Sequence, residues 1–370
     1  MLILSHDHVE AVLATLTTDD LLSLARRSLC TNVPPSTGDA TEPARLVRPS
    51  VSYTALFMPG WLPEESQEVR SENGGSMGIK VVCVPSASNK KANGLPATTL
   101  LLDKTTGAVD AVVNAGALTA VRNTAGSLFA TSLLLPKSRP APKSLVLFGA
   151  GLQIRIHIQH FVKAYPTIST VYVVNRTTDG DSRNVQDMKT VLQGLPRTVK
   201  HTELLKLGDS HRVAETTRNA DIIIAATSSE VPLFQSNDVR GGAVIILIGA
   251  YKPTMREVSP ELLFRSKVPG HSDPTMASIL VDTQEGVRSE AGDVIDALQI
   301  SDSGSSDKKL HLVEIRALAN SDPADEACKL AEEHSLRVYK SVGVAAQDIA
   351  ISESVVRKAR QMGLGQDVAF

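Results

Sequence analysis

The chain has 370 residues, with 38 lysines and arginines against 40 aspartates and glutamates, so its net charge is only −2. Without an excess of positive charge, a nucleic acid is a poor candidate partner. Apolar residues make up 42% and charged residues 21%, which is typical of a globular protein and too apolar for a disordered one. No apolar run approaches the roughly 20 residues that span a bilayer, so we expect no contact with a membrane. The length suggests two domains.

The N-terminal sequence and the cysteines favour a cytoplasmic location. The first residues, MLILSHDHVE, reach histidine and aspartate too early for the apolar core of a signal peptide. The three cysteines, Cys30, Cys83 and Cys328, are too scattered for a disulfide framework or a metal site. We therefore expect a reducing compartment and no bound metal.

The first part of the chain is predicted to be a helix followed by short strands. Residues 19–29 place apolar side chains at helical spacing. Three β-rich runs bounded by turn residues follow, at residues 45–57, 78–84 and 98–103. Residues 118–135 are predicted to form a helix that Pro136 ends. Polar or Gly/Pro-rich stretches predict loops at residues 31–43, 63–78 and 301–309.

From residue 144 onward, short apolar runs alternate with amphipathic segments. The runs show little alternation, which is typical of strands buried on both faces of a parallel sheet; they are residues 144–148, 170–175, 221–225, 243–248 and 278–282. After residue 322 the chain is predicted to be mostly helical, in pieces at 334–341, 345–352 and 355–362. The fold class is therefore α/β. We expect a Rossmann-type doubly wound parallel sheet domain at residues 126–321, and a mixed α+β domain from residues 1–125 with 322–370.

The first of these runs leads directly into a Gly-x-Gly turn. Gly149 permits the tight turn, and Gly151 lets the backbone approach a pyrophosphate at the N-terminus of the next helix. The third position of this fingerprint is Ile154 instead of glycine or alanine, which weakens the match. In its strand–turn–helix context the turn nevertheless predicts dinucleotide binding by Gly149, Ala150, Gly151, Leu152 and Gln153.

The end of the second run predicts which dinucleotide binds. An NAD site places an acidic residue there for the ribose hydroxyls, whereas this chain has Asn175, Arg176 and Thr177. A guanidinium can form a charge-assisted pair with a 2′-phosphate, and a threonine can add a hydroxyl. Arg176 could instead be only a solvated loop cation. We expect NADPH/NADP+, with NADH less favoured.

Two later strand ends are predicted to line the same crevice, because ligands bind at the carboxyl ends of such sheets. These ends carry small and polar residues that would let a nicotinamide ribose approach. They could instead be only short turns. The residues are Ala226, Thr227, Ser228 and Gly249.

Five ordered blocks give the chain a family likeness. The sequence resembles the ornithine cyclodeaminase/mu-crystallin family of NAD(P)-dependent enzymes over nearly its whole length. The blocks are a strand with a Thr-Gly turn at 98–107, a Leu-Thr-x-x-Arg segment at 118–125, the Gly-Ala-Gly-x-Gln turn with His157, Glu-Ala-Gly-Asp at 290–293 after Val281 and Asp282, and Lys-Ser-Val-Gly at 340–343 with Gln347 and Asp348.

The resemblance implies that the N-terminal domain and the C-terminal tail bind the substrate and build a homodimer. It also implies that basic residues, here Arg45, Lys80 and Arg122, hold the α-carboxylate of the substrate, and that Thr98 lines the same pocket. The sequence context agrees for Lys80 and Arg122, because a cation among apolar or small residues is costly unless an anion meets it. Any one of these cations could instead pair with a carboxylate of the protein.

One departure from the family pattern bears on the reaction. Where cyclodeaminases carry an aspartate that handles the amine and the attacking water, this chain has Tyr251. A tyrosine, with a pKa of about 10, cannot be that anionic base at neutral pH. Cyclodeamination is thus disfavoured, and the chain looks more similar to the ketimine reductases of the family.

The sequence therefore predicts an NADPH-dependent reductase of imines that bear an adjacent carboxylate, with cyclic or N-substituted amino acids as products. Lys80, Arg122 and Tyr251 are the expected catalytic residues; Tyr251 could donate a hydrogen bond or only pack, and His157 is expected to be structural. The alternatives are an ornithine cyclodeaminase or an amino-acid dehydrogenase using NAD, a non-catalytic NADPH- and small-acid-binding protein of the mu-crystallin type, and a scaffold that only has the fold.

Overall fold

The computed structural model describes residues 1–30, 45–63, 75–86, 95–135, 140–180, 182–269, 276–303, 307–320 and 335–369. The chain divides into two compact units. Unit 1 is Met1–Gly126 with Val344–Phe370, and unit 2 is Ser127–Gly343. The first boundary lies one residue from the predicted one and falls within helix α3 (Leu118–Leu134). The second boundary lies after Gly343, whereas the sequence predicted it after residue 321. The described residues 335–343 therefore belong to unit 2.

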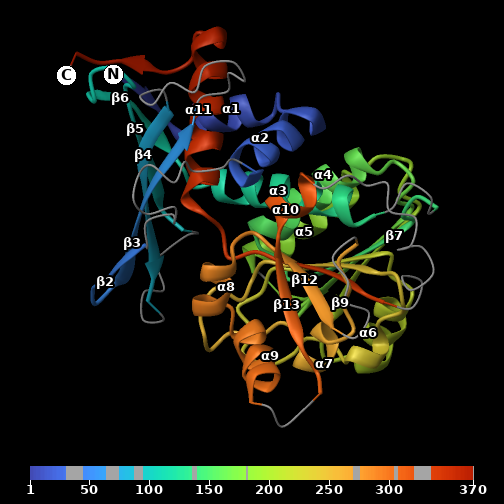
Figure 1. Ribbon diagram of the computed structural model, residues 1–370. Coiled ribbons are helices and arrows are strands. Elements are labelled where there is room, and N and C mark those ends of the chain that lie inside the picture. Colours follow the sequence, from blue (N-terminus) through green and yellow to red (C-terminus); the bar gives the residue numbers. More distant parts are fainter. Residues whose placement is uncertain are drawn as a thin grey trace. The chain divides into compact units, whose positions relative to one another are not determined.

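Unit 1 is built on a mixed sheet. Its described strands form a seven-stranded sheet in the order β15-β1-β6-β5-β4-β3-β2. The antiparallel pairs of β1 with β15 place the two chain ends side by side (Figure 1). The strands are β1 (Leu2–Leu4), β2 (Leu46–Pro49), β3 (Tyr53–Pro63), β4 (Gly75–Pro85), β5 (Ala97–Leu102), β6 (Val109–Asn114) and β15 (Gln366–Asp367).

Helix α11 (Ala345–Met362) covers one face of this sheet. It packs on β3, β4 and β5, and also on α1 (His6–Leu13) and α2 (Thr18–Cys30). Two glycines allow the close approach: a Cβ on Gly60 would lie 2.9 Å from Ala345, and one on Gly78 would lie 3.0 Å from Ile349. The side chains on this face of β4 are therefore buried between the sheet and the helix.

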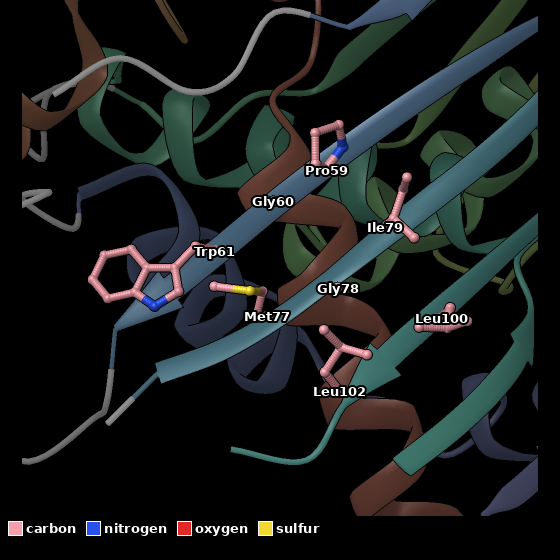
Figure 2. A pocket seen from close by; sticks show the side chains of 8 residues that line it. All are labelled: Pro59, Gly60, Trp61, Met77, Gly78, Ile79, Leu100 and Leu102. Atoms are coloured by element: carbon pink, nitrogen blue, oxygen red, sulfur yellow. The ribbon is translucent and has the colours of Figure 1, made fainter. Parts of the chain in front are cut away.

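The opposite face of the sheet carries an apolar pocket. Figure 2 shows the lining side chains on the near side of β3, β4 and β5, with α11 behind the strands. Met77 is 52% exposed there. The pocket is lined by Pro59, Gly60, Trp61, Met77, Gly78, Ile79, Leu100 and Leu102.

Unit 2 contains a parallel sheet. Its described strands follow the order β13-β12-β14-β11-β10-β7-β8-β9, and the pairs between neighbours are all parallel. The strand order reverses between β7 and β10, which is the switch point where such sheets bind ligands. The strands are β7 (Ser144–Phe148), β8 (Thr170–Asn175), β9 (His201–Lys206), β10 (Ile222–Ala225), β11 (Val244–Leu247), β12 (Ala277–Val281), β13 (Leu310–Glu314) and β14 (Arg337–Lys340).

Helices connect these strands, as the βαβ pattern predicts. The core consists of the apolar side chains of the strands, several of which, such as Ile223 and Ile245, are fully buried. The α/β class with a doubly wound parallel sheet is thus confirmed. The helices are α4 (Leu152–Ala164), α5 (Arg183–Gln193), α6 (Ser210–Arg218), η2 (Ser236–Asp238), α7 (Pro260–Leu263), α8 (Gln284–Glu290), α9 (Gly292–Asp302) and α10 (Ile315–Ala319).

Two local predictions were wrong. The piece at 334–341, predicted to be helical, contains strand β14, which pairs with β11 and β12 in the parallel sheet. The single run at 45–57 is two strands, β2 and β3, because the chain turns back between Pro49 and Tyr53. The predicted loop at 31–43, residues 64–74 of the predicted loop at 63–78, Pro136 and Cys328 lie outside the described residues. Residues 75–78 of that second loop belong to strand β4 instead. Across the described ranges, no helix combines the length and apolar character that a bilayer crossing requires.

Candidate active site

Two cations and one carboxylate form a buried cluster in unit 1. Nζ of Lys80, on β4, lies 2.9 Å from Oδ1 of Asp348, in the first turn of α11. Nε of Arg122, on α3, lies 3.2 Å from the same oxygen. All three residues are at most 4% exposed. We call Lys80, Arg122 and Asp348 the cation cluster.

Neighbouring polar groups hold the two cations in place. Lys80 also donates to Oγ1 of Thr119 over 3.1 Å. The Nη1 group of Arg122 donates to Oε1 of Gln347 over 3.0 Å and to the side chain of Asn123. Asn123, the next residue in the chain, thus helps to fix the guanidinium. These contacts set the orientation of both cations before any ligand binds.

The charges of the cation cluster do not balance. Two cations meet one carboxylate, so the cluster carries a net positive charge in a buried setting. Burial lowers the pKa of Lys80 to about 8; Asp348 opposes this shift, and the charges of Arg122 and Arg45 add to it. Burial alone would raise the pKa of Asp348, but the charges of Lys80 and Arg122 hold it below its ordinary value. An added anion would therefore stabilise the cluster.

Unpartnered polar atoms beside the cluster point to a ligand. Oδ2 of Asp348 and Oγ1 of Thr99 are buried and have no hydrogen-bond partner among the described residues. Thr99 lies directly opposite Lys80 in the pairing of β4 with β5. Because buried polar groups are nearly always hydrogen-bonded, these atoms fit a site that a polar molecule occupies.

The structure separates Thr98, one of the predicted pocket residues, from this cluster. Thr98 pairs with Val81 and is exposed, so its side chain lies on the other face of the sheet from Lys80. The prediction was displaced by one residue, since side chains alternate along a strand. Thr99 occupies the place expected for Thr98. Arg45 is half-buried, and its charge acts on Lys80, which agrees with its predicted position near the cluster.

In unit 2 the predicted phosphate-binding turn has an open geometry. Gly149 has a φ of 114°, which favours glycine, and a Cβ there would lie 3.0 Å from the carbonyl oxygen of Ala226. Gly151 precedes α4 and provides no side-chain cap, and a Cβ on it would meet nothing within 4 Å. Oε1 of Gln153 is buried without a partner among the described residues. The N-terminus of α4 can thus accept an anion.

The end of β8 carries one exposed cation and no acidic residue at positions 175–177. Asn175 closes the turn by donating to the carbonyl oxygen of Thr177 over 2.7 Å. Arg176 is exposed, and no hydrogen bond or ion pair joins it to a described residue. Ala150 and Leu152 belong to the same turn as Gly149 and Gly151. The residues present therefore fit a dinucleotide with an anionic group near Arg176.

The loops after β10 and β11 are fastened to each other. Glu257, which the sequence did not indicate, accepts hydrogen bonds from the backbone of both Thr227 and Gly249. Ala226 donates to the carbonyl oxygen of Phe148 over 3.1 Å at the switch point, and Ser228 is exposed. A glutamate ten residues beyond a strand end carries no recognisable signal without the loop geometry.

Tyr251 and His157 both have polar contacts within the protein. Nζ of Lys252 lies 5.7 Å from the centre of the Tyr251 ring. His157 is fully buried and contacts Gln153 O at 2.7 Å and Ser127 Oγ at 3.0 Å. Burial lowers the pKa of His157 to about 4, which agrees with a structural role. Among the described residues, no group of histidine, cysteine and acidic side chains could hold a metal ion.

Comparison with known proteins gives a family match. The model of the ornithine cyclodeaminase/mu-crystallin family matches residues 69–308, more than half of the chain. The ketimine reductase mu-crystallin of Mus musculus is 28% identical over 268 residues, covering 72% of this chain and 71% of that protein. A Delta(1)-pyrroline-2-carboxylate reductase of Bacillus thuringiensis is 27% identical over 324 residues, covering 86% and 85%.

A solved structure is similar over the whole length. The Delta(1)-pyrroline-2-carboxylate reductase of Thermococcus litoralis, in complex with NADH and L-proline, has a TM-score of 0.75. It is 23% identical, and the match covers 100% of both chains. At this identity the likeness establishes the fold.

Proposed function

Because the chain belongs to the ornithine cyclodeaminase/mu-crystallin family, we propose that it is an NADPH-dependent reductase of imines that carry a carboxylate next to the C=N bond. It is an oxidoreductase that acts on carbon–nitrogen bonds, like its relatives named ketimine reductase and pyrroline-2-carboxylate reductase. The observation that carries the proposal is the cation cluster with its net positive charge and its unpartnered oxygen atoms.

The cluster binds the substrate carboxylate. Arg122 is already anchored through Nε and Nη1, and no hydrogen bond from its Nη2 reaches a described residue. That nitrogen can donate to a carboxylate oxygen, and Arg45 adds positive charge nearby. Asp348 keeps both cations in position, so the carboxylate meets a preorganised pocket.

Reduction of a C=N bond requires a hydride at carbon and a proton at nitrogen. When bound, the reduced nicotinamide supplies the hydride. Lys80 can supply the proton, because its pKa of about 8 lets the amine both release and regain it near neutral pH. Thr99 Oγ1 can donate a hydrogen bond to the substrate carboxylate, and Asp348 Oδ2 can accept one from the protonated substrate nitrogen.

We propose NADPH as the preferred cofactor on the basis of Arg176. Neither Asn175 nor Thr177 carries the negative charge that would repel a 2′-phosphate. The N-terminus of α4 and the turn Gly149–Gly151 would hold the pyrophosphate. Ala226, Thr227, Ser228 and Gly249 would line the remainder of the crevice, and Tyr251 its wall.

The proposal is tested by following NADPH absorbance with the purified chain. Cyclic imines such as Delta(1)-pyrroline-2-carboxylate and N-alkyl imines of 2-oxo acids serve as substrates, with NADH in parallel. We expect reduction of at least one such imine, faster with NADPH. Deamination of ornithine, or oxidation of amino acids with NAD without any imine reduction, would overturn the proposal, as would binding of NADPH with no turnover of any imine.

We also propose that the chain forms a homodimer, as the family resemblance implies. The apolar pocket of Figure 2 is a suitable interface, because a symmetric pair of identical chains would cover both copies of it at once. Light scattering should give a mass of two chains for the unmodified protein. For Met77→Glu the measured mass should fall towards that of a single chain. A single-chain mass for the unmodified protein would contradict the dimer.

We propose a cytoplasmic location on the basis of the cysteines. Cys30 and Cys83 are free in the structure, and free thiols are typical of reducing compartments.

A further inference from the structure

Glu257 joins the two loops that follow strands β10 and β11. Its carboxylate is fully buried. Oε1 accepts hydrogen bonds from the Thr227 backbone N–H at 2.7 Å and from the Thr227 hydroxyl at 3.0 Å. Oε2 accepts the Gly249 N–H at 2.7 Å. One side chain thus satisfies three donors from the carboxyl ends of two neighbouring strands.

Gly249 fits this arrangement only because it lacks a side chain. A Cβ there would lie 2.1 Å from the Thr227 carbonyl oxygen and 2.3 Å from Oε1 of Glu257. The space beside the glycine is therefore filled by the other loop, and the glycine serves the contact between the loops. We call Thr227, Gly249 and Glu257 the loop clasp.

The segment between Gly249 and Glu257 is held from its other side too. A Cβ on Gly292, at the start of α9, would lie 2.4 Å from the Met255 carbonyl oxygen. Nη2 of Arg256 donates to Oδ1 of Asp296 over 2.9 Å, and its backbone N–H donates to Ser229 O over 2.7 Å. The loop that carries Tyr251 is therefore fixed on both sides.

Lys340 places a positive charge near the clasp. Its Nζ is fully buried, lies 3.8 Å from Oδ1 of Asp293, and has no hydrogen-bond partner among the described residues. Asp293 in turn accepts the backbone N–H of Glu257 at 3.4 Å. Burial raises the pKa values of Glu257 and Asp293, and the charge of Lys340 opposes both shifts. The lysine thus favours the carboxylate form that can accept all three hydrogen bonds.

We infer that Glu257 is a positioning residue, which preorganises the loops after β10 and β11 for the bound dinucleotide. The inference rests on the proposed dinucleotide site of unit 2. Loops fixed in advance lose little conformational freedom on binding, so the cofactor binds more tightly. Glu257 itself acts only through Thr227 and Gly249, since its carboxylate is buried.

The test compares Glu257→Gln with Glu261→Gln, an exposed glutamate at the start of α7. A glutamine keeps the shape but turns a donor NH2 towards one of the donors of the clasp. In Glu257→Gln we expect faster hydrogen exchange at the amides of Thr227 and Gly249 without cofactor. We also expect NADPH to bind about tenfold more weakly, as measured by fluorescence titration. Glu261→Gln should match the unmodified protein in both.

A second pair of variants covers the case in which Glu257→Gln does not fold. Thr227→Val removes the hydroxyl that donates to Glu257, and Thr227→Ser retains it. Because Thr227 would also line the cofactor crevice, the readout is hydrogen exchange at the Gly249 amide without cofactor, together with NADPH binding. Faster exchange and weaker binding in the valine variant, both recovered in the serine variant, support the clasp; equal exchange in both variants overturns it. Unchanged exchange and unchanged binding in Glu257→Gln overturn the inference alone. If the unmodified chain binds no dinucleotide, the proposed function fails together with the inference.

Discussion

Lys80 on β4 and Arg122 on α3 donate to the same oxygen of one carboxylate, Oδ1 of Asp348, over 2.9 and 3.2 Å. The carboxylate thereby orients both cations but neutralises only one charge. The remaining positive charge is buried, and an anionic substrate would compensate it. From the sequence, Lys80 and Arg122 could pair either with a carboxylate of the protein or with an anionic ligand. In the structure they pair with Asp348, and the remaining positive charge still favours an anion.

Asp348→Asn should be strongly destabilising. Removing the carboxylate leaves two buried cations without a counter-charge, and such a loss costs about 3–5 kcal/mol of unfolding free energy. Urea denaturation measures it. The matched control is Asp110→Asn, which removes a partly exposed ion pair with Arg360 and should cost less than about 1 kcal/mol. Equal losses of unfolding free energy in the two variants would show that Lys80 and Arg122 do not depend on Asp348 as their counter-charge.

Binding of a carboxylate ligand should weaken above the pKa of Lys80. Below pH 8 Lys80 is already an ammonium, so the affinity is constant; above pH 8 the amine is neutral, and Lys80 must take up a proton when the carboxylate binds. Calorimetric titration with pyrrole-2-carboxylate across pH 6 to 10 should show this loss, with proton uptake above pH 8. Affinity that is independent of pH over that range would place the ligand away from Lys80.

The lowered pKa of Lys80 also predicts how the unfolding free energy changes with pH. The folded-state pKa of Lys80 lies below the ordinary value of 10.5, so between pH 8 and that value the unfolded chain binds more protons. Unfolding free energy from this group therefore rises with pH in that window. In Lys80→Met the rise should be absent, as chemical denaturation at pH 8 and pH 10 can show; an undiminished rise in the variant would assign it to other groups.

The two adjacent threonines of β5 provide a sharp test of the register. Thr99→Val should raise the KM for the imine by about tenfold, because it removes a buried hydroxyl opposite Lys80. Thr98→Val, on the exposed face, should leave KM and kcat unchanged. Steady-state kinetics of both variants decide the matter, and the reverse ranking would contradict the placement of the pocket.

Arg176→Ala should change the choice of cofactor. Loss of the guanidinium should raise the KM for NADPH by roughly 10- to 100-fold and leave that for NADH nearly unchanged. Arg183→Ala, on the nearby helix α5 and 81% exposed in its side chain, controls for loss of general positive charge. An equal rise in the KM for NADPH and for NADH would show that Arg176 does not contact the 2′-phosphate.

The sequence predicted the central strands of unit 2 well because their β-branched runs are buried on both faces. Strand β14 is equally buried, but it was missed because its sequence carries two charged residues. Arg337 and Lys340 make the segment look like a polar helix, yet both are buried, and their charged groups lie near Gly242 O and Asp293. Such partners, distant in the chain, leave no local pattern.

The site residues show the same limit. Lys80 and Arg122 were identified by the family resemblance, but Asp348, 268 residues away from Lys80, was named only as part of a matching block. Choosing Thr99 over Thr98 required the pairing of β5 with β4, since a shift of one residue moves a side chain to the other face. Glu257 became apparent only from the contact between two loops.

The most direct test of the central claim is the imine-reduction rate of Arg122→Ala. Measured as kcat/KM with NADPH and a carboxylate-bearing imine, it should fall by roughly 100-fold, because a charge-assisted contact with the carboxylate is lost. Arg360→Ala, which removes an exposed cation of α11, should leave it unchanged. If Arg122→Ala folds and keeps the kcat/KM of the unmodified protein, the cation cluster does not bind the substrate carboxylate.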